Sequence, residues 1–213
     1  VILASFASTS VGYSTSASVG ERGMSKARVA TTFSEIARLS SGAVVSDVDH
    51  EITSICTDSR VCESGSLFVA LSGEQADGHA FVGDAIRRGA VAAMVSVDWA
   101  RGNEAEINRL RPAAFLLVPN PLAGLQGLAA EYCRRLTEPF TIGITGSNGK
   151  TTTKELLGSI LRKSGEAYVT RGNLNSEIGL PLSVLELSKH HRFGVFEMEI
   201  GRASCRERVC HRV

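Results

Sequence analysis

A glycine-rich segment that ends in lysine and threonine is the part of this sequence best suited to chemistry. It follows an apolar run, 140–144, and reads Gly146-Ser147-Asn148-Gly149-Lys150-Thr151-Thr152. Glycines let a turn point its backbone N–H groups at one spot, and a helix that begins at Lys150 adds its N-terminal partial charge to that of the lysine. Such a loop binds the phosphates of a nucleoside triphosphate, with Lys150 at the β- and γ-phosphates and the Thr151 hydroxyl at Mg²⁺. The alternative is a strand–helix turn whose glycines serve packing only, and Gly-Lys-Thr directly after a strand disfavours it.

The spacing of this loop departs from the common phosphate-binding pattern. G-x-x-x-x-G-K-[ST] would require glycine at position 144, where this sequence has Ile144. The spacing here is Gly146-x-x-Gly149-Lys150-Thr151. This tighter form resembles the ATP loop of the Mur ligases and the folylpolyglutamate synthases, which are ATP-dependent enzymes that form amide bonds.

Length and composition exclude several classes of protein. The chain has 213 residues, of which 43% are hydrophobic, enough for one or two domains with cores. With 23 basic and 22 acidic residues and a net charge of +1, it shows no nucleic-acid or membrane-surface signal, and no apolar run is long enough to span a membrane. Cys56, Cys62 and Cys133 fit neither a zinc site nor a redox pair, so we expect buried or half-buried thiols in a reduced, cytoplasmic protein.

Both ends of the chain differ from the sequence between them. Residues 1–23 are rich in Ser, Ala, Gly and Val and lack the basic start and continuous apolar core of a targeting peptide. We expect translation to begin at Met24 and this upstream segment to be non-native. Residues 200–213 lose all apolar period and gain Arg and Cys abruptly, so we expect the native part of this sequence to break off near Glu199 and the last 14 or so residues to be an artefact. The alternative for these last residues is an exposed basic tail.

The residues between these ends predict two α/β units. A capping box, Thr32-x-x-Glu35, begins a helix that ends at Gly42, and Glu138-Pro139 marks a boundary between units at 24–137 and 138–199. Further elements are predicted as strands at 52–57, 67–71, 91–95, 113–118, 167–170 and 192–198, and as helices at 79–88, 121–136, 150–163 and 181–187. In the helix at 150–163, the inward residues are predicted to be Leu156, Leu157, Ile160 and Leu161. Alternating strands and helices predict parallel sheets with right-handed crossovers.

Three more segments extend the resemblance to the Mur ligases. The first runs from Thr57-Asp58-Ser59-Arg60 through 65–73 to Asp77-Gly78-His79, and resembles the UDP-sugar-binding domain of the ligases that add the third residue and the terminal dipeptide. The second, residues 172–182, reads GNLNSEIGLPL and resembles a loop of the dipeptide-adding branch. The third, Phe196-Glu197-Met198, matches the start of a Glu-Met-Gly strand end, with Glu199 in place of the glycine. The resemblance covers about residues 26–199.

The resemblance implies an α/β fold with a small N-terminal substrate domain and the first part of an ATPase domain. It implies a ligase that adds D-Ala-D-Ala to UDP-N-acetylmuramoyl-tripeptide through an acyl phosphate, with ATP and Mg²⁺ as cofactors. Lys150 and Glu197 would be catalytic, Thr151 and Glu197 would bind the metal, and residues 146–152 would bind the nucleotide. The alternative for Glu197 is a polar residue that ends a strand and faces water.

Five residues are implied as substrate contacts: Ser59, Arg60, Asn173, Asn175 and Glu177. Each has a simpler alternative, since Asp58 to Arg60 could form an Asx turn and the other three could be loop hydrogen-bonders. His79 with Asp77 is more typical of a cap or turn than of a ligand site. His190 and His191 are interpreted as solvated loop residues.

Two other functions remain open. One is the sister ligase that adds the diamino acid to UDP-N-acetylmuramoyl-dipeptide, against which the 172–182 loop argues. The other is a non-catalytic nucleotide-sugar-binding module, against which the Gly-Lys-Thr loop argues. The family's remaining metal and lysine-carbamate positions, and most of the D-Ala-D-Ala site, would follow residue 199, so we expect this polypeptide to be inactive alone and the full-length protein to be monomeric.

Overall fold

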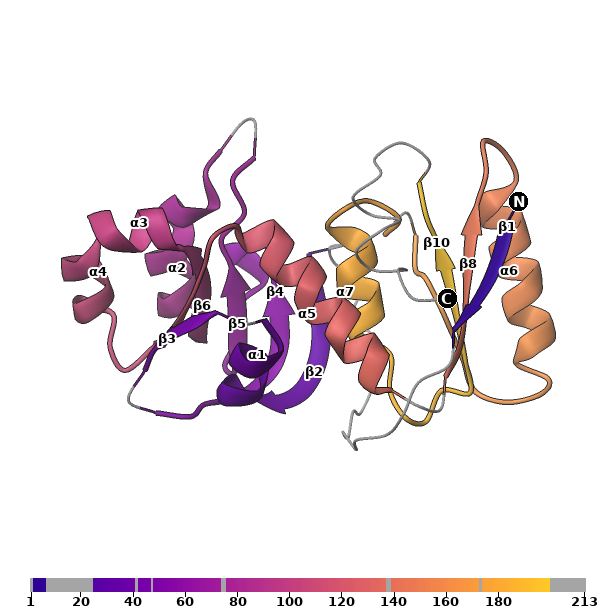
Figure 1. Ribbon diagram of the computed structural model, residues 1–213, viewed down its shortest axis with the longest axis horizontal. Helices are drawn as coiled ribbons and strands as arrows, with labels where there is room; N and C mark the ends of the chain where they lie inside the picture. Colours follow the sequence, from indigo (N-terminus) through magenta and orange to yellow (C-terminus); the bar gives the residue numbers. More distant parts are fainter. Residues whose placement is uncertain are drawn as a thin grey trace. The chain divides into compact units, whose positions relative to one another are not determined.

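The computed structural model separates into two compact units, which we describe one at a time. The amino-terminal unit is Ser16–Leu128, and the carboxy-terminal unit combines Val1–Thr15 with Ala129–Val213 (Figure 1). The described residues are 2–6, 25–40, 42–46, 48–73, 76–136, 139–172 and 174–199. The predicted start at Met24, the predicted tail at 200–213 and the candidate contact Asn173 lie outside them.

A six-stranded sheet forms the centre of the amino-terminal unit. Its strand order is β2-β4-β5-β6-β7-β3. The four inner strands are parallel, as predicted, while β2 and β3 pair antiparallel at the two edges and were not predicted. The strands are β2 Lys26–Thr32, β3 Ala43–Val45, β4 Glu51–Cys56, β5 Ser66–Val69, β6 Ala90–Ser96 and β7 Ala114–Val118. The edge strands are short or polar on alternate residues, so neither carries the apolar run by which the inner strands were found.

Helices and 3₁₀ turns connect these strands. They are α1 Phe33–Ser40, η1 Ser59–Val61, η2 Gly78–Phe81, α2 Val82–Arg87, α3 Val97–Gly102 and α4 Glu104–Arg109. Helix α5, Pro121–Arg135, follows β7 and contains the point at which the two units divide, between Leu128 and Ala129. The Thr32 hydroxyl accepts the N–H of Glu35, which confirms the predicted cap of α1. The helix predicted at 79–88 is instead a 3₁₀ turn followed by α2, and α3 and α4 were missed because each has only six residues.

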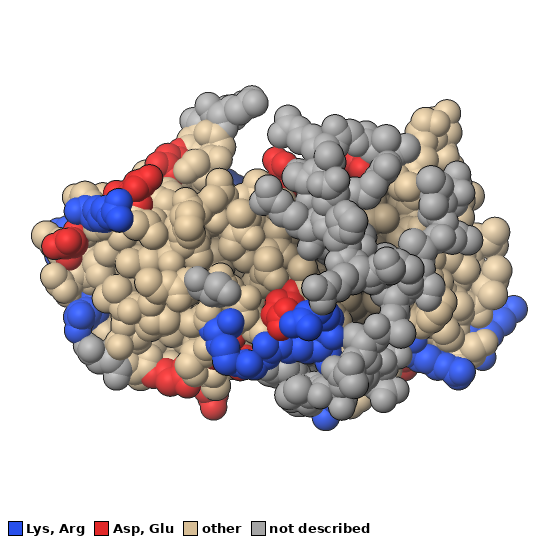
Figure 2. Space-filling view, in the orientation of Figure 1, with Lys and Arg blue, Asp and Glu red and all other residues tan. Residues whose placement is uncertain are grey.

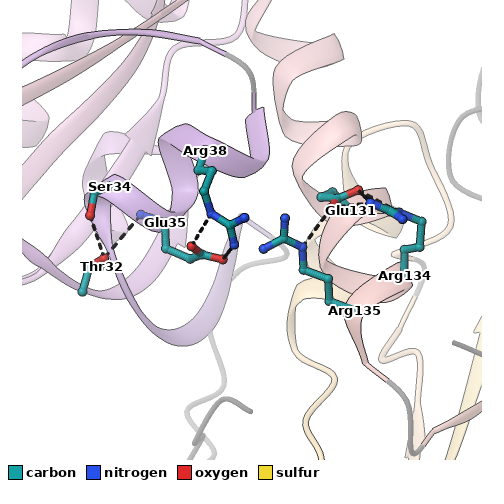
Figure 3. Close-up of polar contacts among 7 residues, drawn as sticks. All are labelled: Thr32, Ser34, Glu35, Arg38, Glu131, Arg134 and Arg135. Atoms are coloured by element: carbon teal, nitrogen blue, oxygen red, sulfur yellow. Dashed lines mark hydrogen bonds and ion pairs between the residues drawn. The ribbon is translucent and has the colours of Figure 1, made fainter. Parts of the chain in front are cut away.

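Oppositely charged residues about one turn apart form ion pairs on α1 and α5. Arg38 donates to Glu35 on α1, and Arg134 and Arg135 donate to Glu131 on α5 (Figure 3). Such pairs add a few tenths of a kcal/mol each to a helix, about 0.2–0.5. On the face drawn in Figure 2, both basic and acidic side chains lie among a larger area of neutral ones.

His79 is a buried structural residue rather than an exposed turn residue. Its ring is 5% exposed and stacks on Trp99 with centroids 5.5 Å apart. The Nε2 atom accepts the backbone N–H of Ser96 at 2.9 Å, so Nδ1 carries the proton and donates to Asp77 at 2.6 Å. These bonds tie η2 to the end of β6, and the cap of η2 is Asp77, whose carboxylate accepts the backbone N–H of His79.

The carboxy-terminal unit contains a four-stranded sheet of order β1-β8-β10-β9. Strands β8 Phe140–Thr145, β10 Phe193–Glu197 and β9 Ala167–Val169 are parallel. Strand β1, Ile2–Phe6, pairs antiparallel with β8, so part of the segment predicted to be non-native has a place in this sheet, and the sheet is mixed rather than parallel. Helix α6, Lys150–Leu161, packs on β8, β9 and β10, and α7, Gly179–Leu185, contacts β10 (Figure 1).

The inward face of α6 differs from the prediction. Leu156 and Ile160 are 63% and 55% exposed, while Lys154 and Gly158 are buried. A side chain at Gly158 would place its Cβ 2.6 Å from Val169 Cγ2, so glycine allows α6 to approach β9. The inward face of α6 is the one that carries Lys154, Leu157, Gly158 and Leu161, which recur at helical spacing, so Leu156 and Ile160 fall on the exposed side.

This correction gives the first prediction. Leu157→Ala is expected to lower the free energy of unfolding by about 2 kcal/mol, because Leu157 packs against the cluster of Ile144, Val169 and Val195. Leu156→Ala, the matched control one residue away, is expected to change it by no more than about 0.5 kcal/mol. Urea denaturation followed by circular dichroism measures both. Equal losses would contradict the assigned face.

Candidate functional site

The turn between β8 and α6 presents an accessible, glycine-shaped backbone. Strand β8 ends at Thr145 and α6 begins at Lys150, with Gly149 as the N-cap. Gly149 has φ of 74°, which side-chain-bearing residues rarely adopt, so the turn depends on glycine there. Ser147, Asn148, Gly149, Thr151 and Thr152 are exposed, and Gly146 is half-buried. The predicted nucleotide-binding residues therefore lie together at the N-terminus of a twelve-residue helix.

Lys150 lies back across this turn. Its Nζ donates to the carbonyl of Gly146 at 2.8 Å, and the residue is half-buried. The ammonium group therefore lies over the same concave backbone whose N–H groups would face an anion. A lysine in this position supplies a full positive charge where a phosphate chain would lie.

Glu197, at the carboxyl end of β10, is the centre of a buried polar cluster. It is 4% exposed, so the alternative of a strand end that faces water is wrong. Its Oε2 accepts the Thr151 hydroxyl at 3.0 Å, and its Oε1 accepts the Asn175 amide at 3.1 Å. Its backbone N–H is bonded to Thr170 Oγ1 at 3.3 Å. The structure thus brings three predicted site residues, Thr151, Asn175 and Glu197, into direct contact.

Strand register explains why these residues meet. In the parallel pair β8–β10, Glu197 lies opposite Ile144, two residues before the glycine turn. The carboxyl ends of neighbouring parallel strands face the crevice in which ligands of α/β sheets bind. Residues 53 positions apart in the chain are therefore held at one edge of the sheet.

The pair Thr151 and Glu197 fits a magnesium ion. Mg²⁺ takes oxygen ligands at about 2.0–2.1 Å in an octahedron, so two adjacent ligands are about 2.9 Å apart. The Thr151 Oγ1 and Glu197 Oε2 atoms are 3.0 Å apart. Among the described residues no group of three or more His, Cys, Asp or Glu could hold a metal ion. A site with one carboxylate and one hydroxyl matches the way Mg²⁺ is bound together with phosphates and water.

Lys154 belongs to this cluster and was missed from the sequence. Its Nζ is 3.5 Å from Glu197 Oε2 and donates to the carbonyl of Gly172 at 3.2 Å. The sequence signal that could have identified Lys154 is its spacing. It follows Lys150 by four residues and Thr151 by three, and so shares their helix face. The apolar period of α6 hid it, because the inward face was predicted from apolar residues alone.

The 172–182 segment contributes unequally to the cluster. Asn175 is 9% exposed, and its carbonyl accepts the N–H of Glu199 at 3.2 Å, which ties the segment to the end of β10. Glu177 is half-buried, and its role as a substrate contact stays a prediction. The role of Asn173, outside the described residues, also stays a prediction.

In the amino-terminal unit, Ser59 and Arg60 lie in η1. The Asp58 carboxylate accepts the backbone N–H of Arg60 at 2.9 Å, so the alternative of an Asx turn is confirmed as geometry. Arg60 also pairs with Asp58 at 2.6 Å while its side chain stays 81% exposed, and Ser59 is 8% exposed. The hydrogen bonds from Arg60 hold the pKa of Asp58 below its ordinary value. The contact of these two residues with a substrate stays a prediction.

Two cysteines flank this turn. Cys56 and Cys62 are buried and Cys133 is half-buried, which confirms the predicted environment of all three thiols. The hydrogen bond with Cys62 lowers the pKa of Cys56 to about 7, and the same bond raises the pKa of Cys62.

His191 corrects another expectation. It is half-buried rather than solvated, its Nδ1 accepts the N–H of Ser188 at 3.0 Å, and its ring meets Tyr168 edge-on. Burial lowers the pKa of His191. His190 is exposed, as expected.

Comparison with known proteins identifies the family to which this chain belongs. Residues 144–211 match the Mur ligase middle domain, and residues 51–132 match the catalytic domain of the Mur ligase family. The chain belongs to the Mur ligase family.

Individual members of this family are similar to the chain in sequence and in structure. The UDP-N-acetylmuramoyl-tripeptide–D-alanyl-D-alanine ligase of Synechocystis sp. is 43% identical over 151 residues, which are 70% of this chain and 31% of that protein. The crystal structure of MurF from Acinetobacter baumannii matches with a TM-score of 0.69 and 33% identity, over 81% of this chain and 36% of the other. MurF ligase from Thermotoga maritima, solved in complex with ADP, matches with a TM-score of 0.59 and 33% identity, over 73% and 34%. The chain thus spans about a third of the length of these relatives.

No helix among the described residues is both long enough and apolar enough to cross a membrane.

The Asp58–Arg60 contact gives the second prediction. Because the folded pKa of Asp58 lies below its reference value of 3.8, the ionised carboxylate stabilises the fold above that pH, and this contribution is lost as the pH falls through the folded pKa. Arg60→Met is expected to raise the pKa of Asp58 toward the reference value, measured by carboxyl ¹³C NMR. Arg101→Met, which removes an exposed guanidinium from α3, is the control and is expected to leave Asp58 unchanged. If Arg60→Met left the titration of Asp58 unmoved, the ion pair would not exist in solution.

Proposed function

We propose that this chain carries the nucleotide-sugar domain and the ATP loop of a peptidoglycan-precursor ligase that joins D-Ala-D-Ala to UDP-N-acetylmuramoyl-tripeptide. The observation that carries the proposal is the contact between Thr151 and Glu197, which places a buried carboxylate beside the first turn of α6. It is supported by the relatives named for this reaction and by a relative solved with ADP. A cytoplasmic location and a monomeric full-length protein belong to the same proposal.

Each residue of the site has a defined task in this reaction. The backbone of residues 146–150 and the ammonium group of Lys150 bind the β- and γ-phosphates of ATP and neutralise charge as the γ-phosphoryl group moves. Thr151 and Glu197 would hold Mg²⁺, which would supply further neutralisation of the phosphate oxygens. Asn175 donates to Oε1 of Glu197, so Oε2 stays directed at Thr151.

The overall reaction has two steps. The free carboxylate of the tripeptide attacks the γ-phosphorus, which forms an acyl phosphate and releases ADP. The amine of D-Ala-D-Ala then attacks the acyl carbon, and phosphate leaves from the tetrahedral intermediate. This catalysis depends mainly on positioning and charge neutralisation.

Two other candidate functions involve the same residues. The sister ligase that adds a diamino acid shares the 57–60 region and the ATP loop, and the 172–182 segment with Asn175 favours the dipeptide-adding enzyme. A nucleotide-sugar-binding module without catalysis would not need the contact between Thr151, which follows the Gly-Lys of the loop, and the buried carboxylate of Glu197. Comparing D-Ala-D-Ala with diamino acids as acceptors in a full-length enzyme separates the two ligases.

Nucleotide binding is the third prediction. The chain is expected to bind ATP with Mg²⁺, and Lys150→Met is expected to raise the Kd about tenfold to a hundredfold, because a charge-assisted bond to phosphate is lost. Thr151→Val is expected to remove most of the gain in affinity from Mg²⁺. Isothermal titration with and without EDTA measures both effects. Lys163→Met is the matched control, since Lys163 is exposed and follows the C-terminal end of α6.

Substrate binding without turnover is the fourth prediction. The chain is expected to bind UDP-N-acetylmuramoyl-tripeptide, and Arg60→Met is expected to weaken this binding about tenfold while ATP binding stays unchanged. Fluorescence anisotropy with a labelled peptide moiety measures the Kd. No ligated product is expected when ATP and D-Ala-D-Ala are added, and product detected by mass spectrometry would contradict the proposed inactivity of this polypeptide alone.

A further inference from the structure

Lys154 is buried to a degree that is unusual for lysine. Its side chain is 1% exposed, although it lies on the second turn of a helix whose neighbouring residues Glu155 and Leu156 face solvent. A lysine is almost never fully buried unless its charge is paired, because removing an ammonium group from water is costly. The partners of Lys154 therefore indicate what the burial serves.

The partners of Lys154 belong to the candidate metal site and to the segment that follows β9. Its Nζ is 3.5 Å from Glu197 Oε2 and donates to the carbonyl of Gly172 at 3.2 Å. Glu155 is also 3.5 Å from this nitrogen, but the Glu155 side chain is 61% exposed. The buried partner of Lys154 is thus Glu197, whose side chain is 5% exposed.

The two oxygens of Glu197 have different surroundings. Oε1 accepts the neutral amide of Asn175, and Oε2 receives both the Thr151 hydroxyl and the Lys154 ammonium group. The proposed magnesium site uses this same Oε2 together with the Thr151 hydroxyl. A lysine and a divalent cation would therefore share one carboxylate oxygen.

We propose that Lys154 is a positioning residue, a built-in counterion that holds the buried Glu197 carboxylate beside Thr151 and weakens the binding of Mg²⁺ there. This inference rests on the proposed nucleotide-binding function. Without Lys154, Glu197 would be a buried charge with neutral donors only, which is strongly destabilising. With Lys154, the incoming divalent ion meets a carboxylate that is already partly neutralised, so its affinity falls.

The carbonyl of Gly172 allows Lys154 to stay in place when Oε2 of Glu197 is shared with a magnesium ion. It gives the ammonium group a second acceptor that is not a candidate ligand of the metal. Gly172 directly precedes the segment that carries Asn175, and Asn175 donates to Oε1 of the same carboxylate. Lys154 therefore links α6, β10 and the 172–182 segment around one group.

Two measurements on the whole chain test this inference, and the second separates it from a purely structural role of Lys154. The first is the melting temperature in EDTA for Lys154→Met, Lys154→Arg and the double variant Lys154→Met with Glu197→Gln. We expect Lys154→Met to lower the Tm by about 5 °C or more, and the double variant to recover most of this loss, because removing both charges leaves no unpaired ion. We expect Lys154→Arg to retain more stability than Lys154→Met.

The second measurement is the Mg²⁺ concentration that gives half of the metal-dependent gain in ATP affinity. It is expected to fall about tenfold in Lys154→Met, since the competing positive charge is gone. Glu155→Gln is the matched control, because it removes the exposed neighbour of Lys154 and is expected to leave both readouts unchanged. Loss of packing alone would not tighten metal binding.

Defined outcomes would overturn this inference. It fails if Lys154→Met has the wild-type Mg²⁺ midpoint, or if the double variant is as unstable as Lys154→Met. Should Lys154→Met not fold, a folded double variant supports the inference and an unfolded one overturns it. If the wild-type chain bound no ATP, the proposed function would fail instead, and the melting comparison in EDTA would still decide whether Lys154 is the counterion of Glu197.

Discussion

The parallel pairing of β10 with β8 is the constraint on which the candidate site depends. It sets Glu197 opposite Ile144, so a carboxylate far along the chain reaches the first turn of α6. A slip of one residue would turn Glu197 to the other face of the sheet and leave Thr151 without its partner. The apolar residues of β10 that face the core, Val195 among them, fix this register, and hydrophobic burial thereby sets the geometry of a polar site.

A buried carboxylate requires more than correct placement. Glu197 is stabilised by two neutral donors, Thr151 and Asn175, and by the charge of Lys154. Helix α6 supplies Thr151 and Lys154, and the 172–182 segment supplies Asn175, so the cluster around Glu197 of β10 joins helix, strand and loop within one unit. A network of this kind specifies a single arrangement, because each member left unpaired would be a buried polar group without compensation.

Close packing of α6 on β9 explains which residues of the helix are buried. Gly158 lets the helix approach β9, and the approach brings Lys154 within reach of Glu197 and Gly172. Leu156 and Ile160 are then left on the exposed side. In the amino-terminal unit, the Asp58 turn leaves the guanidinium of Arg60 exposed while Ser59 stays buried, so the two residues of that motif have different access to a ligand.

The sequence by itself determined the family, the inner parallel strands and the strand–glycine turn–helix segment at 140–161, because apolar runs and glycine–lysine–threonine spacing are local signals. Through the resemblance of short motifs it also assigned Thr151 and Glu197 to one site, and the structure brings the two into contact. Only the tertiary structure decided the antiparallel edge strands, the inward face of α6 and the burial of Lys154. Those features depend on which surfaces meet after the chain has folded, and the free energy of a buried lysine is set by a carboxylate 43 residues away rather than by its neighbours in sequence.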